Sequence, residues 1–277
     1  MTDVNDCTHD CSTCSANCSS RENNKPQFQP ANEFSHIKHV IGVVSGKGGV
    51  GKSIVTSMLA VTMQRRDYKC AIMDADITGP SIPKAFGTTG TIYASGDNMV
   101  PLKTKTGIKM ISVNPLLSSD DSPVVWRGPV IAGTVSQFWT GVLWEDVDYM
   151  FIDCPPGTGD VPLTIFQSIK LDGIIIVTTP QDLVSMIVGK AINMANMMNI
   201  PILGFVENMS YIKCPDCGKE IEIFGKSKAD QIVSEYGIKL LGRIPVDPKL
   251  SALVDNGIIE LMENDYVDNA ADIIEKL

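Results

Sequence analysis

Hydrophobic and polar positions follow two patterns that alternate along most of the chain. Short, nearly continuous apolar runs predict buried β-strands, and they occupy residues 69–73, 147–152, 173–179 and 202–207. Apolar residues also recur at helical spacing, in residues 54–66 and 183–198 and in a further helix up to Leu143. Because strands that alternate with helices form βαβ units, we predict an α/β fold with a mostly parallel sheet and helices on both faces.

Two shorter stretches depart from this alternation and predict β-hairpins. In residues 99–113, two short strand patterns flank the turn sequence Lys105-Thr106-Gly107. A second β-like run, residues 220–224, follows Gly218. Residues 77–83, in contrast, contain too many glycines and prolines for a regular element and predict a loop.

The N-terminal segment, residues 1–35, shows neither period. It is polar, rich in Asn, Ser and Thr, and contains Pro26 and Pro30, so we predict a flexible tail followed by one domain over residues 36–277. The first 20 residues lack the apolar segment of a secretory signal, and no apolar run approaches the length of a membrane span. We therefore expect a cytoplasmic protein without a membrane partner.

The hydrophobic content and the net charge of the chain bear on its core and on its possible partners. Hydrophobic residues make up 44% of the 277, enough for a substantial core, and the formal net charge is −9. An acidic balance of this size argues against a broad nucleic-acid surface, so we expect no nucleic-acid partner.

The stretch from Ile41 to Ser53 predicts a nucleotide site. It runs from a strand pattern through a glycine-rich turn into a helix pattern, and Gly46-x4-Gly51-Lys52-Ser53 fits the P-loop motif. Glycines let backbone N–H groups approach phosphate oxygens, and the helix N-terminus adds a favourable dipole. We predict that Lys52 reaches the β- and γ-phosphates and that Ser53 ligates Mg²⁺. The predicted nucleotide-binding residues of this loop are Gly46, Lys47, Gly48, Gly49, Val50, Gly51, Lys52 and Ser53.

Polar residues at the ends of three predicted strands extend this site. Asp153 ends an apolar strand in the manner of a Walker B carboxylate, which holds Mg²⁺, here through a water molecule. Asp76 is placed to orient or deprotonate the attacking water, although both it and Asp74 could instead cap the loop backbone. Asn208 follows a strand at the edge where α/β sheets present ligand contacts. No Asn-Lys-x-Asp guanine signature is present, so ATP is favoured over GTP.

The eight cysteines form two groups and two single residues. A quartet with the spacing Cys-x3-Cys-x2-Cys-x3-Cys can wrap one metal centre, either an iron–sulfur cluster or zinc, or can remain as free thiols; it consists of Cys7, Cys11, Cys14 and Cys18. Cys214 and Cys217 can form half a metal site, a redox pair or half a zinc ribbon, or can remain as two inert thiols. A two-fold dimer would supply the missing half. Cys70 and Cys154 lie in or beside strand patterns and are interpreted as buried small hydrophobic residues.

Lys47 distinguishes this loop from a general P-loop. Two lysines on one phosphate loop would crowd positive charge unless the second lysine binds another phosphate. The sequence Lys-Gly-Gly-Val-Gly-Lys-Ser resembles the deviant P-loop of the ParA/MinD/nitrogenase-iron-protein superfamily. That resemblance implies a homodimer in which Lys47 crosses to the partner's nucleotide, as an arginine finger does, and acts in catalysis together with Asp76. The alternative is a solvated loop lysine.

Together with residues 76–83, 153–160 and 214–217, this loop resembles the Mrp/ApbC family of iron–sulfur cluster carrier ATPases. The tail quartet is similar to that of nucleotide-binding scaffold proteins, although its spacing is tighter than theirs. The resemblance implies an ATP-binding homodimer with slow ATP hydrolysis, in which Cys214 and Cys217 of both chains bind a 4Fe–4S cluster and deliver it to apo iron–sulfur proteins.

Two other functions share parts of this pattern. A positioning ATPase of the MinD type would need a basic amphipathic helix for the membrane, whereas residues 258–277 carry six acids against Lys276 alone. A reductase component that passes electrons through a bridging cluster is the other alternative.

Overall fold

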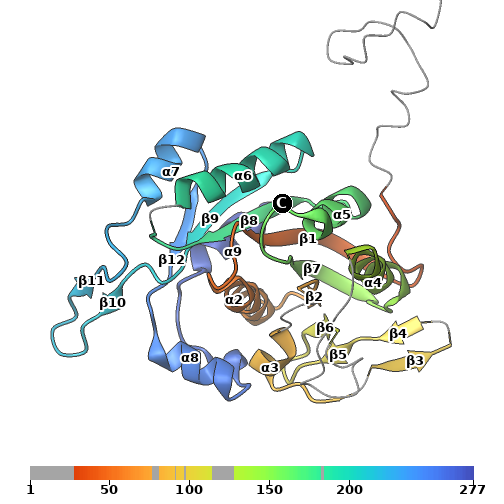
Figure 1. Ribbon diagram of the computed structural model, residues 1–277. Coiled ribbons are helices and arrows are strands. Elements are labelled where there is room, and N and C mark those ends of the chain that lie inside the picture. The colour runs from red at the N-terminus through yellow and green to blue at the C-terminus, as the bar shows by residue number, and fades with distance from the viewer. Residues whose placement is uncertain (1–27, 77–80, 91, 97, 114–127, 182–183) are drawn as a thin grey trace, which may run out of the picture.

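The centre of the protein is an eight-stranded sheet with the order β12-β9-β8-β1-β7-β2-β6-β5 (Figure 1). The computed structural model describes residues 28–76, 81–90, 92–96, 98–113, 128–181 and 184–277. All neighbouring strands are parallel except β5 and β6, which are antiparallel. The strands are β1 (His36–Ser45), β2 (Cys70–Asp74), β5 (Leu102–Lys103), β6 (Lys109–Ile111), β7 (Asp146–Asp153), β8 (Gly173–Thr178), β9 (Ile202–Glu207) and β12 (Leu240–Arg243).

Helices cover both faces of the sheet. One face packs against α4 (Gly128–Gly141), α5 (Asp160–Ser168), α6 (Val184–Met197) and α7 (Ala229–Tyr236). The other packs against α2 (Lys52–Arg65), α3 (Ile82–Phe86), α8 (Pro248–Asp255), a 3-10 turn η3 (Ile259–Leu261) and α9 (Asp268–Ile274). The central strands therefore need apolar side chains on both sides, which is why β8 is buried at every position and reads as a continuous apolar run.

The α/β class and the parallel sheet predicted from the sequence are confirmed. The hairpin predicted around residues 105–107 is also present, since Leu102 pairs with Met110 and Lys103 with Lys109. One further hairpin was not predicted: β3 (Tyr93–Ser95) pairs antiparallel with β4 (Asn98–Val100). Its side chains are exposed or half-buried, so it leaves no apolar period in the sequence.

Two other expectations need correction. Residues 77–83 were predicted to form a loop, but α3 begins at Ile82. Pro83 is compatible with the first turn of this helix, because the N–H that proline lacks would have no helical partner there. The methionine-rich helix pattern of residues 186–198 predicts core packing rather than a metal site, because no cysteine or histidine accompanies the thioethers. In the structure these methionines are divided: Met194 is buried, whereas Met186 and Met197 are exposed. The cause is that α6 packs on the sheet along one face only.

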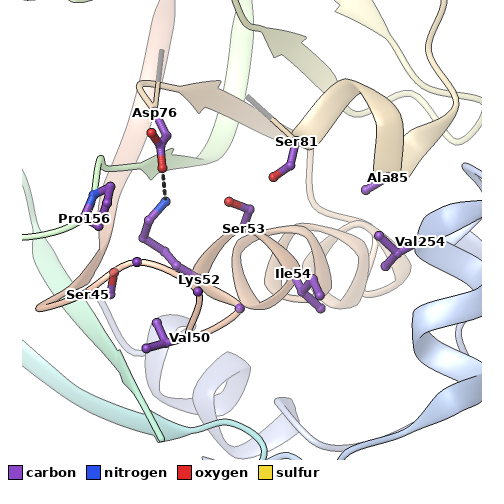
Figure 2. A pocket seen from close by; sticks show the side chains of 13 residues that line it. Ser45, Val50, Lys52, Ser53, Ile54, Asp76, Ser81, Ala85, Pro156 and Val254 are labelled. Atoms are coloured by element: carbon purple, nitrogen blue, oxygen red, sulfur yellow. Dashed lines mark ion pairs between the residues drawn. The ribbon is translucent and has the colours of Figure 1, made fainter. Parts of the chain in front are cut away.

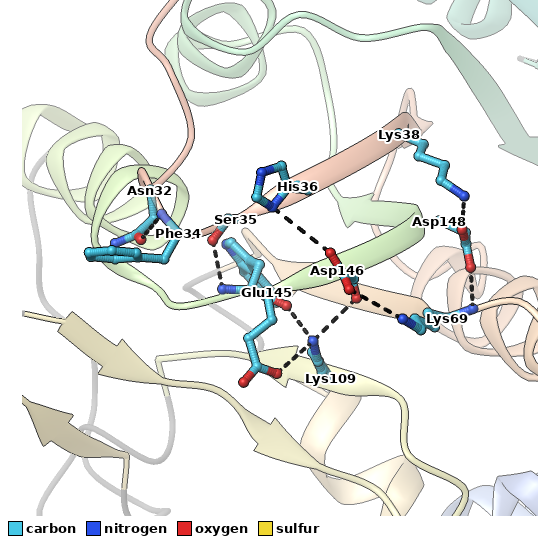
Figure 3. Close-up of polar contacts among 11 residues, drawn as sticks. Asn32, Phe34, Ser35, His36, Lys38, Lys69, Lys109, Glu145, Asp146 and Asp148 are labelled. Atoms are coloured by element: carbon cyan, nitrogen blue, oxygen red, sulfur yellow. Dashed lines mark hydrogen bonds and ion pairs between the residues drawn. The ribbon is translucent and has the colours of Figure 1, made fainter.

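The described part of the N-terminal segment packs against the body. Gln29 N donates to the carbonyl of Ser168, and Trp139 Nε1 donates to the carbonyl of Gln29. Asn32 is buried and its Nδ2 donates to Asn98 Oδ1 at 2.6 Å. The packed body thus begins before residue 36. Figure 3 shows Asn32 and the polar contacts around the following strand, including Lys69 and Asp146, 3.4 Å apart. The cysteine quartet lies outside the described residues.

Within the ranges described above, no helix combines the length and the apolar character needed to span a lipid bilayer.

Candidate functional site

The phosphate-loop residues connect β1, in the middle of the sheet, to α2. Gly51 precedes the helix with φ of 79°, and a Cβ there would lie 2.1 Å from Asn208 Nδ2. A Cβ on Gly46 would lie 1.7 Å from Ile187 Cγ2. A side chain at either position would force Asn208 or Ile187 to shift, and at Gly51 it would also strain the backbone, so glycine lets the loop lie close to the elements around it.

The N-terminus of α2 opens into a cavity of about 300 Å³. No side chain among the described residues caps this helix end, so its first N–H groups point into the cavity without side-chain acceptors. Figure 2 shows the loop from Ser45 to Ile54 on one side of the cavity, with Asp76 and Ser81 on the other. Uncapped N–H groups and the positive end of the helix dipole suit an anion such as phosphate.

Lys52 lies at the base of this cavity between two carboxylates. Its Nζ is 2.8 Å from Asp153 Oδ1 and 3.6 Å from Asp76 Oδ2 (Figure 2 shows the second pair). Burial disfavours the charged amine, but the charge and hydrogen bond of Asp153 outweigh it, so the pKa of Lys52 is raised. Lys52 therefore stays protonated and can bind an anion throughout the physiological pH range.

Asp153 ends β7 and is fully buried. Ser53 Oγ donates to its Oδ2 at 2.6 Å, and Thr56 Oγ1 lies 2.9 Å from its Oδ1. A hydroxyl and a carboxylate side by side at the mouth of a phosphate loop are the hard oxygen donors that Mg²⁺ prefers, so these residues fit that ion. Thr56 was not predicted, although its position three residues after Ser53, on the same helix face, was a usable signal.

Asp74 is the neighbour of Asp153 on the adjacent strand β2 and is also buried. Burial, together with repulsion from Asp153, raises the pKa of Asp74 well above its usual value. Ser112 Oγ donates to Asp74 Oδ2 at 3.0 Å, and the N–H of Asp76 lies 3.2 Å from Oδ1. Asp74 thus holds the loop that carries Asp76, as the capping alternative expected.

Asn208 follows β9 and contacts the backbone of the phosphate loop. Its Nδ2 donates to the carbonyl of Val50 at 2.8 Å, and its Oδ1 accepts from the N–H of Met209. The structure therefore shows Asn208 positioning the loop. A direct contact with nucleotide stays a prediction.

Lys47 extends from the loop to Gln181, whose Oε1 accepts a hydrogen bond from Lys47 Nζ. Gln181 follows β8 and was not identified from the sequence. This contact keeps Lys47 at the surface beside the loop. Its predicted action on a second chain is not tested by a single protomer.

Cys214 and Cys217 lie on a two-stranded projection, which we call the cysteine hairpin: β10 (Ile212–Lys213), the turn and β11 (Glu220–Ile221). This confirms the predicted hairpin, although its second strand ends at Ile221. Backbone N–H groups of Cys217 and Asp216 face the Cys214 sulfur and, with the Cys217 thiol, lower the pKa of Cys214. Cys217 is exposed and Cys214 half-buried, so both can reach a ligand outside the chain.

One protomer offers no complete metal site in its described residues, where no three His, Cys, Asp or Glu side chains cluster suitably. Cys70 and Cys154 are buried, as expected, and burial raises the pKa of Cys154 to about 12. These two cysteines are therefore unreactive thiols inside the core.

Comparison with known proteins agrees with this geometry. The chain is 45% identical over 235 residues to an iron-sulfur cluster carrier protein of Clostridium perfringens, which covers 82% of each. It is 41% identical, over 82% of each chain, to a cytosolic Fe-S cluster assembly factor of Candida glabrata.

Solved structures of other proteins have a similar fold. A nucleotide-binding protein from Archaeoglobus fulgidus in complex with ADP superposes with a TM-score of 0.75 at 43% identity, covering 83% of this chain and 90% of that one. The cell division ATPase MinD of Pyrococcus furiosus has a TM-score of 0.60 at 20% identity, over 86% and 98% of the two chains, and shares the fold. Residues 36–277 match the family described as ParA, NUBPL iron-transfer P-loop NTPase, and the chain belongs to that family.

Proposed function

We propose that this protein is an ATP-hydrolysing carrier or scaffold that holds a 4Fe–4S cluster between two copies of the chain and transfers it to apo iron–sulfur proteins. The observation that carries the proposal is the cysteine hairpin, which carries one exposed and one half-buried thiol, half of a four-cysteine site, on a chain that also has a phosphate loop. Relatives at over 40% identity are named as iron–sulfur cluster carriers.

In the nucleotide site, each residue has a role that follows from its position. The N–H groups at the start of α2 and the ammonium of Lys52 bind phosphate oxygens, which requires Lys52 to exchange Asp153 for the nucleotide. Ser53 and Asp153 would hold Mg²⁺, which neutralises charge on the phosphates. Asp76, across the cavity, orients the attacking water, and Lys47 reaches the nucleotide of the partner chain.

In the cluster site, symmetry completes the ligand set. A two-fold axis brings the same surface of two copies together, so two thiolates from each chain give four. The lowered pKa of Cys214 supports this role because the thiolate is the form that binds iron. Because each chain supplies only two of the four cysteine ligands, separation of the two copies would release the cluster to an apo protein.

The C-terminal helix argues against a MinD-type positioning ATPase. Ala270, Ala271 and Ile274 of α9 are buried against the body, and Arg66 is 2.8 Å from Asp272 and 3.2 Å from Glu275. Its apolar face is therefore already used for packing, and its outer face is acidic, which an anionic membrane repels.

Iron stoichiometry tests the proposal. After anaerobic reconstitution, a dimer with a bridging cluster and two filled tails would hold roughly twelve irons, about four of them at the hairpins. Cys214→Ser and Cys217→Ser should each remove about a third of that iron and abolish transfer to an apo ferredoxin-type acceptor. Cys70→Ala, which removes a buried thiol, is the matched control and should change neither. A full iron load in Cys214→Ser would contradict the bridging cluster.

A further inference from the structure

Arg243, the last residue of β12, contacts the cysteine hairpin. Its guanidinium nitrogens lie 3.9 Å from Glu220 Oε2 and 3.9 Å from Glu222 Oε1. The same guanidinium stacks over the ring of Tyr211, 5.2 Å from its centroid, at the base of the hairpin. Both glutamates are at least one-third exposed, so each pair is weak by itself and adjusts easily.

The inner side of the same arginine is held firmly. Glu207, at the end of β9, is buried, and its Oε2 lies 3.4 Å from Arg243 Nε. Ser210 Oγ accepts from Arg243 Nε at 2.8 Å and donates to Glu207 Oε2 at 2.5 Å. Ser227 Oγ donates to the other oxygen of Glu207 at 2.8 Å. These contacts hold the inner side of Arg243 in place, because displacing the arginine would leave the buried Glu207 without this cation.

Glu207 is also one residue from the nucleotide site. The next residue, Asn208, donates to the Val50 carbonyl in the phosphate loop. The backbone of the same segment is tied to the end of β12, since the N–H of Ile244 donates to the Glu207 carbonyl at 2.9 Å. A continuous set of contacts therefore runs from the phosphate loop through Asn208, Glu207 and Arg243 to Glu220 and Glu222.

We propose that Arg243 is a positioning residue that couples the nucleotide state of the phosphate loop to the placement of the cysteine hairpin. This inference rests on the proposed function, since it assigns the route by which ATP acts on the cluster site. The two sides of Arg243 suit this role. Its Nε contacts Glu207 and Ser210, next to the residue that binds the phosphate loop, and its outer nitrogens contact exposed glutamates in the hairpin and directly after it. A change in the loop on nucleotide binding would thus move the outer contacts and alter the exposure of Cys214 and Cys217.

Thiol alkylation in the apo protein tests this link without a cluster. The full-length, reduced protein is treated with iodoacetamide in ADP or in a non-hydrolysable ATP analogue, and peptide mapping separates Cys214 and Cys217 from the other thiols. In the wild type we expect the two nucleotides to change the alkylation rate by about fivefold or more. In Arg243→Gln and in Glu220→Gln/Glu222→Gln the ratio should fall to about one, with nucleotide affinity retained.

The double glutamate variant is expected to keep its fold, because it leaves the buried pair of Arg243 with Glu207 intact. It therefore tests the outer contacts even if Arg243→Gln misfolds. Arg243→Lys, which keeps the charge but not the planar fork, should restore part of the ratio. Arg66→Gln is the matched control, since Arg66 also pairs with three acids but lies at the C-terminal end of α2, away from the hairpin. Its ratio should equal that of the wild type.

A wild-type ratio in the double glutamate variant, or no nucleotide effect in the wild type, would overturn the proposal. Iron analysis keeps the two hypotheses apart. Wild-type protein without iron at the hairpin contradicts the carrier function, whereas a normal iron load with an unchanged alkylation ratio in the variants contradicts only the role of Arg243. Because the outer pairs are exposed, raising the salt concentration well above the physiological range should also reduce the wild-type ratio.

Discussion

Asp74 of β2 and Asp153 of β7 are register partners on adjacent strands, and Lys52 lies 2.8 Å from Asp153. Two buried carboxyl groups with one nearby ammonium cannot both ionise without a large free-energy penalty. The two carboxyl groups have different surroundings: Asp153 is in direct contact with Lys52, and Asp74, which is buried beside Asp153, has the raised pKa.

This relationship predicts a pH-dependent stability. A carboxyl whose pKa is raised on folding stabilises the fold fully below its unfolded value, and that contribution is lost as the pH rises through the folded pKa. Asp74→Asn, which cannot ionise, should therefore be more stable than the wild type at about pH 8, by about 2–4 °C in Tm. The gain should disappear toward about pH 4. Thermal denaturation without nucleotide and Mg²⁺ measures it, and an equal difference at both pH values would contradict the assignment.

Lys52→Ala should abolish tight ATP binding and also destabilise the fold. Removing the ammonium leaves Asp153 buried without its cation, which costs about 3–5 kcal/mol. Denaturant unfolding gives the loss of stability, and titration with a fluorescent ATP analogue gives the loss of binding. Lys38→Ala, which removes an exposed lysine paired with Asp148, is the control and should change both only slightly.

Lys47→Ala should separate hydrolysis from binding. If Lys47 acts on the partner's nucleotide, its loss should slow ATP turnover by about 10²–10³-fold while the affinity of a monomer for ATP is largely retained. Asp76→Asn should likewise bind ATP without turning it over. Normal turnover in Lys47→Ala would show that this lysine serves only as a surface contact of Gln181.

Asn208→Ala should weaken nucleotide binding by loosening the phosphate loop. The Val50 carbonyl loses its donor, a loss of about 1–2 kcal/mol, which corresponds to roughly tenfold in affinity if the loop disorders. Calorimetric titration with ADP measures this change. Asn256→Ala removes a comparable amide contact on the exposed surface at the end of α8 and should leave ADP affinity unchanged.

Deleting residues 1–20 tests the cysteine quartet apart from the hairpin. If each tail holds one 4Fe–4S cluster, the deletion should remove about two thirds of the reconstituted iron, because about eight of roughly twelve irons reside in the tails. Dimerisation through the hairpins should persist in analytical ultracentrifugation. Zinc in place of iron, found by metal analysis of the full chain, would instead assign the quartet to a structural site.

Features encoded by neighbouring residues were accessible from the sequence. The phosphate loop needs consecutive glycines, a lysine and a serine, so Gly46 to Ser53 indicated the site directly. The central strands lie between two layers of helices, so their apolar runs predicted a parallel sheet. The pair Cys214 and Cys217 was equally visible, because two ligands three residues apart form a local motif.

Other features depend on which strands become neighbours. Ser53 and Asp153 are 100 residues apart and meet because β1 and β7 are adjacent, and Asp74 acquires its raised pKa from the same sheet order. Arg243 contacts Glu207 and the cysteine hairpin only because β12 pairs with β9. The exposure of Met197 follows from how α6 packs. In the sequence these side chains are far apart, and long-range packing alone sets the distances and burial that determine their charge and chemistry.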